Sequence, residues 1–307
     1  MIMKTLLRYS GKWTPGGAPG VYVTRVAVGG SVEAGLETGQ LRRDPSIESA
    51  TCGNEFITVR LKRDALARVA LDVAMAGTDC VTSDALRGIT VAGAPRADLA
   101  GTADWRTARQ ELAAELTATL AAAAGATVNR AEREASVARD TPGRLVKKAL
   151  EFAGADAIRF AVASSTLDGP PPDPEQTARH VLGNPAYAVR YAHAAAVAVL
   201  RWAGTEPRPE SAAGFRPSRL AEPEELALLD ALSWLPERVA VAARRGRPDV
   251  FARYLATLAN KTIDTVNTTG FTAGRAVTIE RLWLARAART GLAAGLGLLG
   301  ITAPGRL

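Results

Sequence analysis

A mixed α+β fold that is mostly α is predicted for this chain of 307 residues. Segments with the alternation of a β-strand lie mainly within the first 61 residues, whereas almost everything after Pro142 has the apolar spacing of helices. Aromatic residues make up only 5% of the chain, so the core must consist mainly of Ala, Leu and Val, which suits closely packed helices. These observations predict a small N-terminal α/β unit and a C-terminal helical bundle.

The N-terminal unit, residues 1–78, contains two strand candidates. Residues 21–28 alternate between apolar and polar side chains and are bounded by Gly and Pro turns, and residues 55–61 form the second candidate. The second candidate runs directly into a predicted helix. The apolar positions of that helix are Leu66, Val69, Ala70 and Val73.

Residues 79–141 are predicted to be a linker that includes one helix. A short strand is predicted at residues 89–91. Asp104 is a suitable N-cap for the helix that follows, and Gly125 is its expected end. Because residues 120–124 are entirely apolar, we expect the second half of this helix to pack against the bundle.

The C-terminal part, residues 142–307, is predicted to be a bundle of about five helices joined by short connections. Gly and Pro clusters mark the ends of these helices. The predicted breaks lie at Gly154, at residues 167–172, at 203–219, near 246–248 and near 270–275.

The formal net charge of +7 directs attention to anionic partners, with nucleic acid first among them. The alternative is a solvated basic surface with no partner. Cys52 and Cys80 have neither metal-ligand spacing nor a disulfide framework, so free, reduced thiols are expected. No apolar stretch reaches the roughly 20 residues that a bilayer requires. We therefore expect a cytoplasmic protein that binds no metal and no cofactor.

A helix that begins after Asn184 carries the most informative side chains. Asn184 can cap this helix, and Pro185 suits its first turn. An aromatic face beside a basic stripe can stack on an unpaired base and hold its phosphates. The competing interpretation is an ordinary buried face with a core histidine. The aromatic face comprises Tyr187, Tyr191, Ala194, Ala198 and Trp202, and the basic stripe comprises Arg190, His193 and Arg201.

This helix resembles one in the anticodon-binding region of arginyl-tRNA synthetases, with the form Asn-Pro-Val-Tyr-Tyr-Val-Gln-Tyr-Ala-His-Ala-Arg. The chain matches it from Asn184 to Ala194 and departs from it at Ala188, Arg190 and Ala195. The Asp-Ala-Leu-Arg motif that names the family's domain is matched by residues 156–159, with Ile in place of Leu. A literal copy at residues 84–87 has the wrong neighbours and is treated as a coincidence.

Further matches follow in the family's order, at residues 223–229, 251–259, 281–287 and 295–307. The resemblance therefore covers roughly residues 150–307. It implies a helical bundle of the class I synthetase anticodon-binding type and a tRNA ligand. Together with the spacing, it predicts the RNA-contacting residues Tyr187, Arg190, Tyr191, His193, Arg201, Trp202, Arg306 and Leu307.

Departures from the family qualify this prediction. The catalytic His-x-Gly-His and Lys-Met-Ser-Lys-Ser motifs have no match among the 307 residues. Residues 42–61 resemble the end of the family's additional N-terminal domain, but Thr58 stands where the family has the Asn that reads the tRNA D-loop. The family commonly ends in Met, and here Leu307 stands instead. Residues 262–266 replace its Phe-Asn-x-Phe-Tyr run.

These departures lead us to expect a non-catalytic relative that binds tRNA and is not an enzyme on its own. The alternative is a protein-interaction module or regulatory subunit that has kept the fold but lost RNA binding, and that assists an enzyme using arginine or arginyl-tRNA. An enzyme with new chemistry is the least supported interpretation, because no cluster of His, Cys and carboxylate side chains suggests a mechanism.

Overall fold

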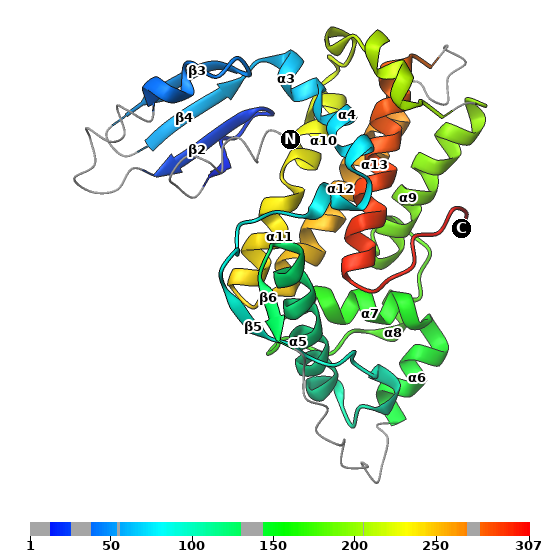
Figure 1. The fold of residues 1–307 in the computed structure, drawn as a ribbon. Helices are drawn as coiled ribbons and strands as arrows, with labels where there is room; N and C mark the ends of the chain where they lie inside the picture. Colours follow the sequence, from blue (N-terminus) through cyan, green and yellow to red (C-terminus); the bar gives the residue numbers. More distant parts are fainter. Residues whose placement is uncertain (1–12, 26–37, 54–55, 130–143, 205, 269–276) are drawn as a thin grey trace.

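The computed structural model of the protein describes residues 13–25, 38–53, 56–129, 144–204, 206–268 and 277–307. A small antiparallel sheet lies on one side of a helical bundle, and the C-terminal tail returns from the last helix towards α9 (Figure 1). The predicted class, α+β and mostly helical, is confirmed. No helix in the described part is long and apolar enough to cross a membrane.

The sheet has the strand order β1-β2-β4-β3, and every neighbouring pair is antiparallel. The central strands β2 and β4 correspond to the two predicted strands, although residues 26–28 and 55 lie outside the described ranges. The outer strands β1 and β3 were not predicted. The bounds are Thr14–Pro15 for β1, Val21–Arg25 for β2, Ile47–Cys52 for β3 and Phe56–Leu61 for β4.

The sheet packs directly on the helical bundle through β2. The Tyr22 hydroxyl lies 3.1 Å from the Ser233 hydroxyl, and the Tyr22 and Trp234 rings are tilted with centroids 5.2 Å apart. The Gly20 N–H donates to Asp230 Oδ1 at 3.1 Å. Burial raises the pKa of Asp230 above its ordinary value. Polar contacts therefore set the position of a largely apolar junction.

Two short helices, α3 (Arg63–Ala67) and α4 (Val69–Ala76), replace the single helix predicted after β4. The predicted apolar positions of this segment, Leu66, Val69, Ala70 and Val73, are all buried. A 3-10 turn, η1 (Gly77–Val81), follows, and both α4 and η1 pack against α13.

The segment between sheet and bundle contains one strand pair and one long helix. The predicted strand is β5 (Thr90–Ala92), and its parallel partner β6 (Thr127–Asn129) was not predicted. A short 3-10 turn, η2 (Leu99–Gly101), precedes α5 (Trp105–Ala123). The predicted cap of α5 is confirmed, because the Asp104 side chain accepts a hydrogen bond from the Thr107 N–H at 2.8 Å. As expected from its apolar second half, α5 packs against α11 and α7.

The C-terminal bundle begins with helices separated where the sequence predicted breaks. Gly154 and Gly246 have φ of +86° and +59°, a conformation that glycine adopts more readily than other residues. One break was missed: α11 begins at Leu235 directly after Trp234, with Pro236 in its first turn. The break predicted near 270–275 falls on residues 269–276, which lie outside the described ranges. The helices are α6 (Arg144–Ala153), α7 (Ala155–Ser164), α8 (Pro174–Thr177), α9 (Pro185–Trp202), α10 (Pro223–Ser233), α11 (Leu235–Arg244), α12 (Pro248–Thr268) and α13 (Ile279–Leu298), and the 3-10 turns η3 (Pro209–Gly214) and η4 (Pro217–Arg219) lie between α9 and α10.

Candidate nucleic-acid interface

The start of α9 is fixed by the side chain of Asn184, as the sequence predicted. Its amide oxygen accepts a hydrogen bond from the Ala186 N–H at 3.1 Å. Its amide nitrogen donates to the carbonyl oxygens of Thr177 at 2.8 Å and Arg179 at 2.7 Å. One residue therefore caps α9 and also holds the preceding loop against it, which sets the direction of the helix.

His180 of the preceding loop and two tyrosines of α9 form a stacked series of rings that reaches the surface. The rings of His180 and Tyr187 are stacked with centroids 5.3 Å apart, and those of Tyr187 and Tyr191 are stacked at 5.7 Å. Tyr187 is half-buried, Tyr191 is 37% exposed and Trp202 is 66% exposed. The competing interpretation of a buried face therefore does not hold for Tyr191 and Trp202.

A groove of about 380 Å³ lies between the second half of α9, the end of α12 and the C-terminal tail. It brings together five of the eight residues predicted to contact RNA: Tyr191, Arg201, Trp202, Arg306 and Leu307. Small side chains of α9 and two residues of α12 complete its lining, namely Ala194, Ala195, Ala198, Val266 and Asn267, together with Gly305 of the tail. An open groove with aromatic and guanidinium groups suits an unstacked base and its phosphate.

The tail reaches this groove because three side chains hold its backbone. Arg159 Nε donates to the Leu299 carbonyl oxygen at 2.6 Å, and the Thr302 N–H donates to Asp156 Oδ2 at 3.3 Å. His193 Nδ1 lies 2.8 Å from the Pro304 carbonyl oxygen. Since a carbonyl only accepts, this ring nitrogen must carry a proton and donate it.

Two of these anchors belong to the Asp-Ala-Ile-Arg segment at residues 156–159. Arg159 is buried and forms an ion pair with Glu115 of α5, with NH2 and Oε1 2.5 Å apart. Gly300, at φ +67°, lies so close that a Cβ there would be 2.8 Å from the Arg159 guanidinium. The motif recognised in the sequence therefore fixes the C-terminal tail, a role that spacing alone did not reveal.

The prediction that α9 presents a basic stripe on its surface is largely wrong. His193 is only 5% exposed, because the tail covers it, so it positions the tail and does not face solvent. Burial lowers the pKa of His193, and the nearby charge of Arg289 lowers it further. Arg190 is half-buried, and its Nε is buried without a hydrogen-bond partner in the described structure. Of the three basic residues on this stripe, only Arg201 is exposed.

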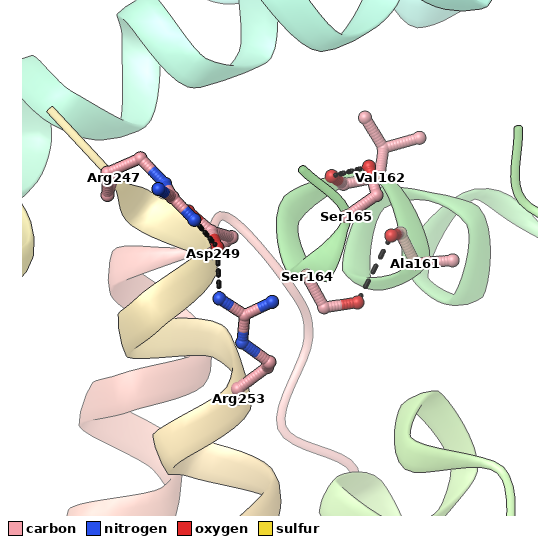
Figure 2. A network of polar contacts seen from close by, with 7 residues as sticks. All are labelled: Ala161, Val162, Ser164, Ser165, Arg247, Asp249 and Arg253. Carbon is pink, nitrogen blue, oxygen red and sulfur yellow. Dashed lines mark hydrogen bonds and ion pairs between the residues drawn. The ribbon is translucent and has the colours of Figure 1, made fainter. Parts of the chain in front are cut away.

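A separate polar network fixes the start of α12 (Figure 2). Arg247 donates to both oxygens of the buried Asp249 carboxylate, at 2.7 and 2.8 Å, and Arg253 pairs with the same carboxylate. Burial opposes ionisation of Asp249, but the hydrogen bonds and charges of the two arginines hold its pKa below the ordinary value. In the same view the hydroxyls of Ser164 and Ser165 donate to backbone carbonyls of α7. We assign the cluster of Arg247, Asp249 and Arg253 a structural role at the first turn of α12, because the buried carboxylate is paired with both arginines.

The chain outside the groove gives few candidates for a reactive centre. Both cysteines are free, as predicted, with Cys52 exposed and Cys80 buried. Within the residues that the structure describes, no group of three or more His, Cys, Asp and Glu side chains is arranged to hold a metal ion.

Comparison with known proteins connects this geometry to a family. Residues 189–307 match the family model described as the DALR anticodon binding domain. The arginine–tRNA ligases of Renibacterium salmoninarum and Kineococcus radiotolerans are each 39% identical to this chain, over 165 and 166 residues and 52% of its length. The alignments cover 30% and 29% of those two ligases, so the chain spans less than a third of these relatives.

The structure of Thermus thermophilus arginyl-tRNA synthetase matches 71% of this chain and 34% of its own, with 25% identity and a TM-score of 0.43. The matched residues 189–307 include most of α9, the later helices α10 to α13 and the tail. Residues 189–307, which are largely helical, thus match the DALR anticodon-binding domain, and about half of this chain is similar to arginyl-tRNA synthetases.

Proposed function

We propose that this protein binds tRNA through the groove between α9, α12 and the C-terminal tail, and that it is a non-catalytic relative of the arginyl-tRNA synthetases. The observation that carries the proposal is the meeting of Trp202 and Tyr191 with Arg201 and Arg306 in one groove. Trp202 is exposed whereas Trp13, Trp234 and Trp283 are buried, and it lies where the tail supplies a second basic residue.

The chemistry of the groove fits an unpaired base. Stacking on an aromatic ring contributes about 1–3 kcal/mol per base and tolerates any base type. Arg201 and Arg306 supply donors for phosphate oxygens, and a net charge of +7 favours encounter with a polyanion. Because phosphate contacts release counterions, affinity for tRNA should fall steeply with salt.

The test measures binding of a labelled tRNA(Arg) transcript at about 50 mM and about 200 mM salt. We expect Trp202→Ala to weaken binding by about tenfold, which corresponds to the loss of one stacked base. Phe152→Ala is the matched control, because Phe152 of α6 is exposed to a similar extent, 64%, and is not among the groove residues. Equal affinities of the wild type and Trp202→Ala, or equal binding to heparin, would contradict the proposal.

We also propose that these 307 residues do not form an aminoacyl-adenylate by themselves. The proposal is supported by the lack of a match to either catalytic motif in the sequence. Pyrophosphate exchange with ATP, arginine and tRNA is the direct assay, and exchange above background would overturn this part.

The alternative of a protein-interaction module has one structural observation in its favour. The α12 residues that replace the family's aromatic run include Thr262, Ile263 and Thr265, which are buried. The α12 side of the groove therefore offers Val266 and Asn267 and no ring. Stoichiometric co-purification with a protein, together with indifference of tRNA binding to Tyr191→Ala, would favour this alternative.

A further inference from the structure

A second hollow, of about 320 Å³, adjoins the groove on α9. It is lined by Val197, Leu200, Arg201, Gly204, Glu206 and Arg289. We propose that this hollow binds a backbone phosphate of the polynucleotide whose base lies in the groove, and that the Glu206 carboxylate occupies the phosphate position in the free protein. This inference rests on the proposed tRNA binding. It adds a phosphate subsite for which the Glu206 carboxylate competes.

The two hollows are adjacent because Arg201 lines both of them. Arg201 is exposed and directly precedes Trp202, the main stacking surface of the groove. Among the described residues, no acidic side chain forms an ion pair with Arg201. A phosphate attached to a nucleoside that stacks on Trp202 would therefore meet an unneutralised guanidinium.

Arg289 supplies the second guanidinium from α13. Its side chain is 27% exposed, and NH1 donates to Glu206 Oε1. The segment that carries Glu206 is held in place, because Arg286 donates to the Pro207 carbonyl oxygen while its guanidinium lies over the Trp283 ring at 5.4 Å. Because Pro207 is held by Arg286, the adjacent Glu206 carboxylate is kept close to Arg289.

The charge of the hollow and the ease of replacing Glu206 both favour phosphate binding. Two guanidinium groups and one carboxylate give the hollow an excess of one positive charge, which becomes two when Glu206 leaves. Carboxylate and phosphate oxygens accept the same charge-assisted hydrogen bonds from arginine, so one can replace the other. Glu206 is 47% exposed, and an ion pair that is so accessible to water contributes little stability. Its displacement by RNA therefore costs little.

The experiment compares two neutralising substitutions with two matched controls. Arg289→Gln and Glu206→Gln act on the hollow. Arg87→Gln and Asp84→Asn change the net charge by the same amounts at an exposed ion pair of 2.8 Å that lines neither hollow. Affinity for the tRNA(Arg) transcript is measured for these four variants and for Arg289→Lys across a salt series, with thermal melts to confirm folding.

We expect Arg289→Gln to weaken binding about tenfold and to reduce the salt slope by about 0.7, the value for one phosphate contact on a single strand. Glu206→Gln should tighten binding about threefold, because a competing charge is removed. Arg289→Lys should restore part of the affinity, since it keeps the charge without the fork.

Equal effects of each variant and its charge-matched control would overturn the subsite. In that case a loss of binding in Trp202→Ala would leave the proposed function standing. If Trp202→Ala also binds like the wild type, the proposed function fails together with the subsite. If Arg289→Gln binds tRNA more weakly than Arg87→Gln but Glu206→Gln binds as Asp84→Asn does, the Glu206 carboxylate does not compete with phosphate. The part of the inference that concerns Glu206 is then wrong.

Discussion

The Nδ1 atom of His193 lies 2.8 Å from the carbonyl oxygen of Pro304, and this contact joins the middle of α9 to the C-terminal tail. Two and three residues farther along, Arg306 and Leu307 line the same groove as Trp202. A buried histidine therefore helps to hold the tail residues that line the groove. The candidate interface depends on the tail being held, and not only on the face of one helix.

Replacing His193 by Ala should release the tail. One hydrogen bond to a buried group is lost, so we expect a decrease in unfolding free energy of about 1–2 kcal/mol and faster amide exchange in residues 302–307. Binding of tRNA should weaken as well, because Arg306 is no longer held in place. Arg201→Ala is the control, since it removes a groove contact without touching the tail. Unchanged exchange in His193→Ala would contradict the anchoring role.

The buried state of His193 also predicts a pH dependence. Burial lowers its pKa in the folded protein, whereas the unfolded value is about 6.5. The folded state therefore binds the proton less readily than the unfolded state, and this histidine's contribution to stability is present above about pH 6.5 and is lost as the pH falls below it. We expect the Tm of the wild type to fall more than that of His193→Gln between about pH 7.5 and about pH 5.5. Equal decreases would show that carboxylates alone determine the profile.

A methyl group at Gly300 should damage the tail anchor. The residue has φ +67°, and an added Cβ would lie 2.8 Å from Arg159 NH2. We expect Gly300→Ala to lower the unfolding free energy by about 2–3 kcal/mol, as measured by urea denaturation. Gly297→Ala is a close control, because Gly297 lies in α13 with no atom within 4 Å of the added Cβ. That variant should be neutral or slightly stabilising.

The two cysteines should differ sharply in reactivity. Burial raises the pKa of the Cys80 thiol to about 12, while Cys52 is exposed. Because the thiolate is the reactive form, a thiol reagent at about pH 8 should modify one cysteine in the folded protein and two after denaturation. Cys52→Ser should leave the folded protein unreactive. Rapid modification of this variant would show that the packing around Cys80 opens.

Local sequence features predicted the elements whose causes are local. Asp104 and Asn184 cap α5 and α9 through their own side chains, and Gly154 and Gly246 end helices through a backbone conformation that other residues disfavour. The spacing of Tyr191 and Trp202 likewise predicted that they share a face, and both line the groove. These features require no knowledge of distant residues.

What the sequence did not predict depends on distant partners. The competing interpretation of a core histidine is confirmed for His193, but its partner, the Pro304 carbonyl 111 residues later, could not be predicted from the spacing of α9. β6 was missed because three residues gain strand character only through their parallel pairing with β5. The tail-holding role of Arg159 depends on Leu299 and on Glu115 of another helix. None of these contacts leaves a periodic trace in the chain.

The contact between Tyr22 and Ser233 has a geometric consequence for any large ligand. Tyr22 is fully buried beside Trp234, so the sheet cannot swing relative to α10 without opening a void there. The sheet lies on the opposite side of the bundle from α9 (Figure 1). The sheet and α9 are therefore held at a constant separation. A molecule that touches both must already match that span, because the protein cannot close around it.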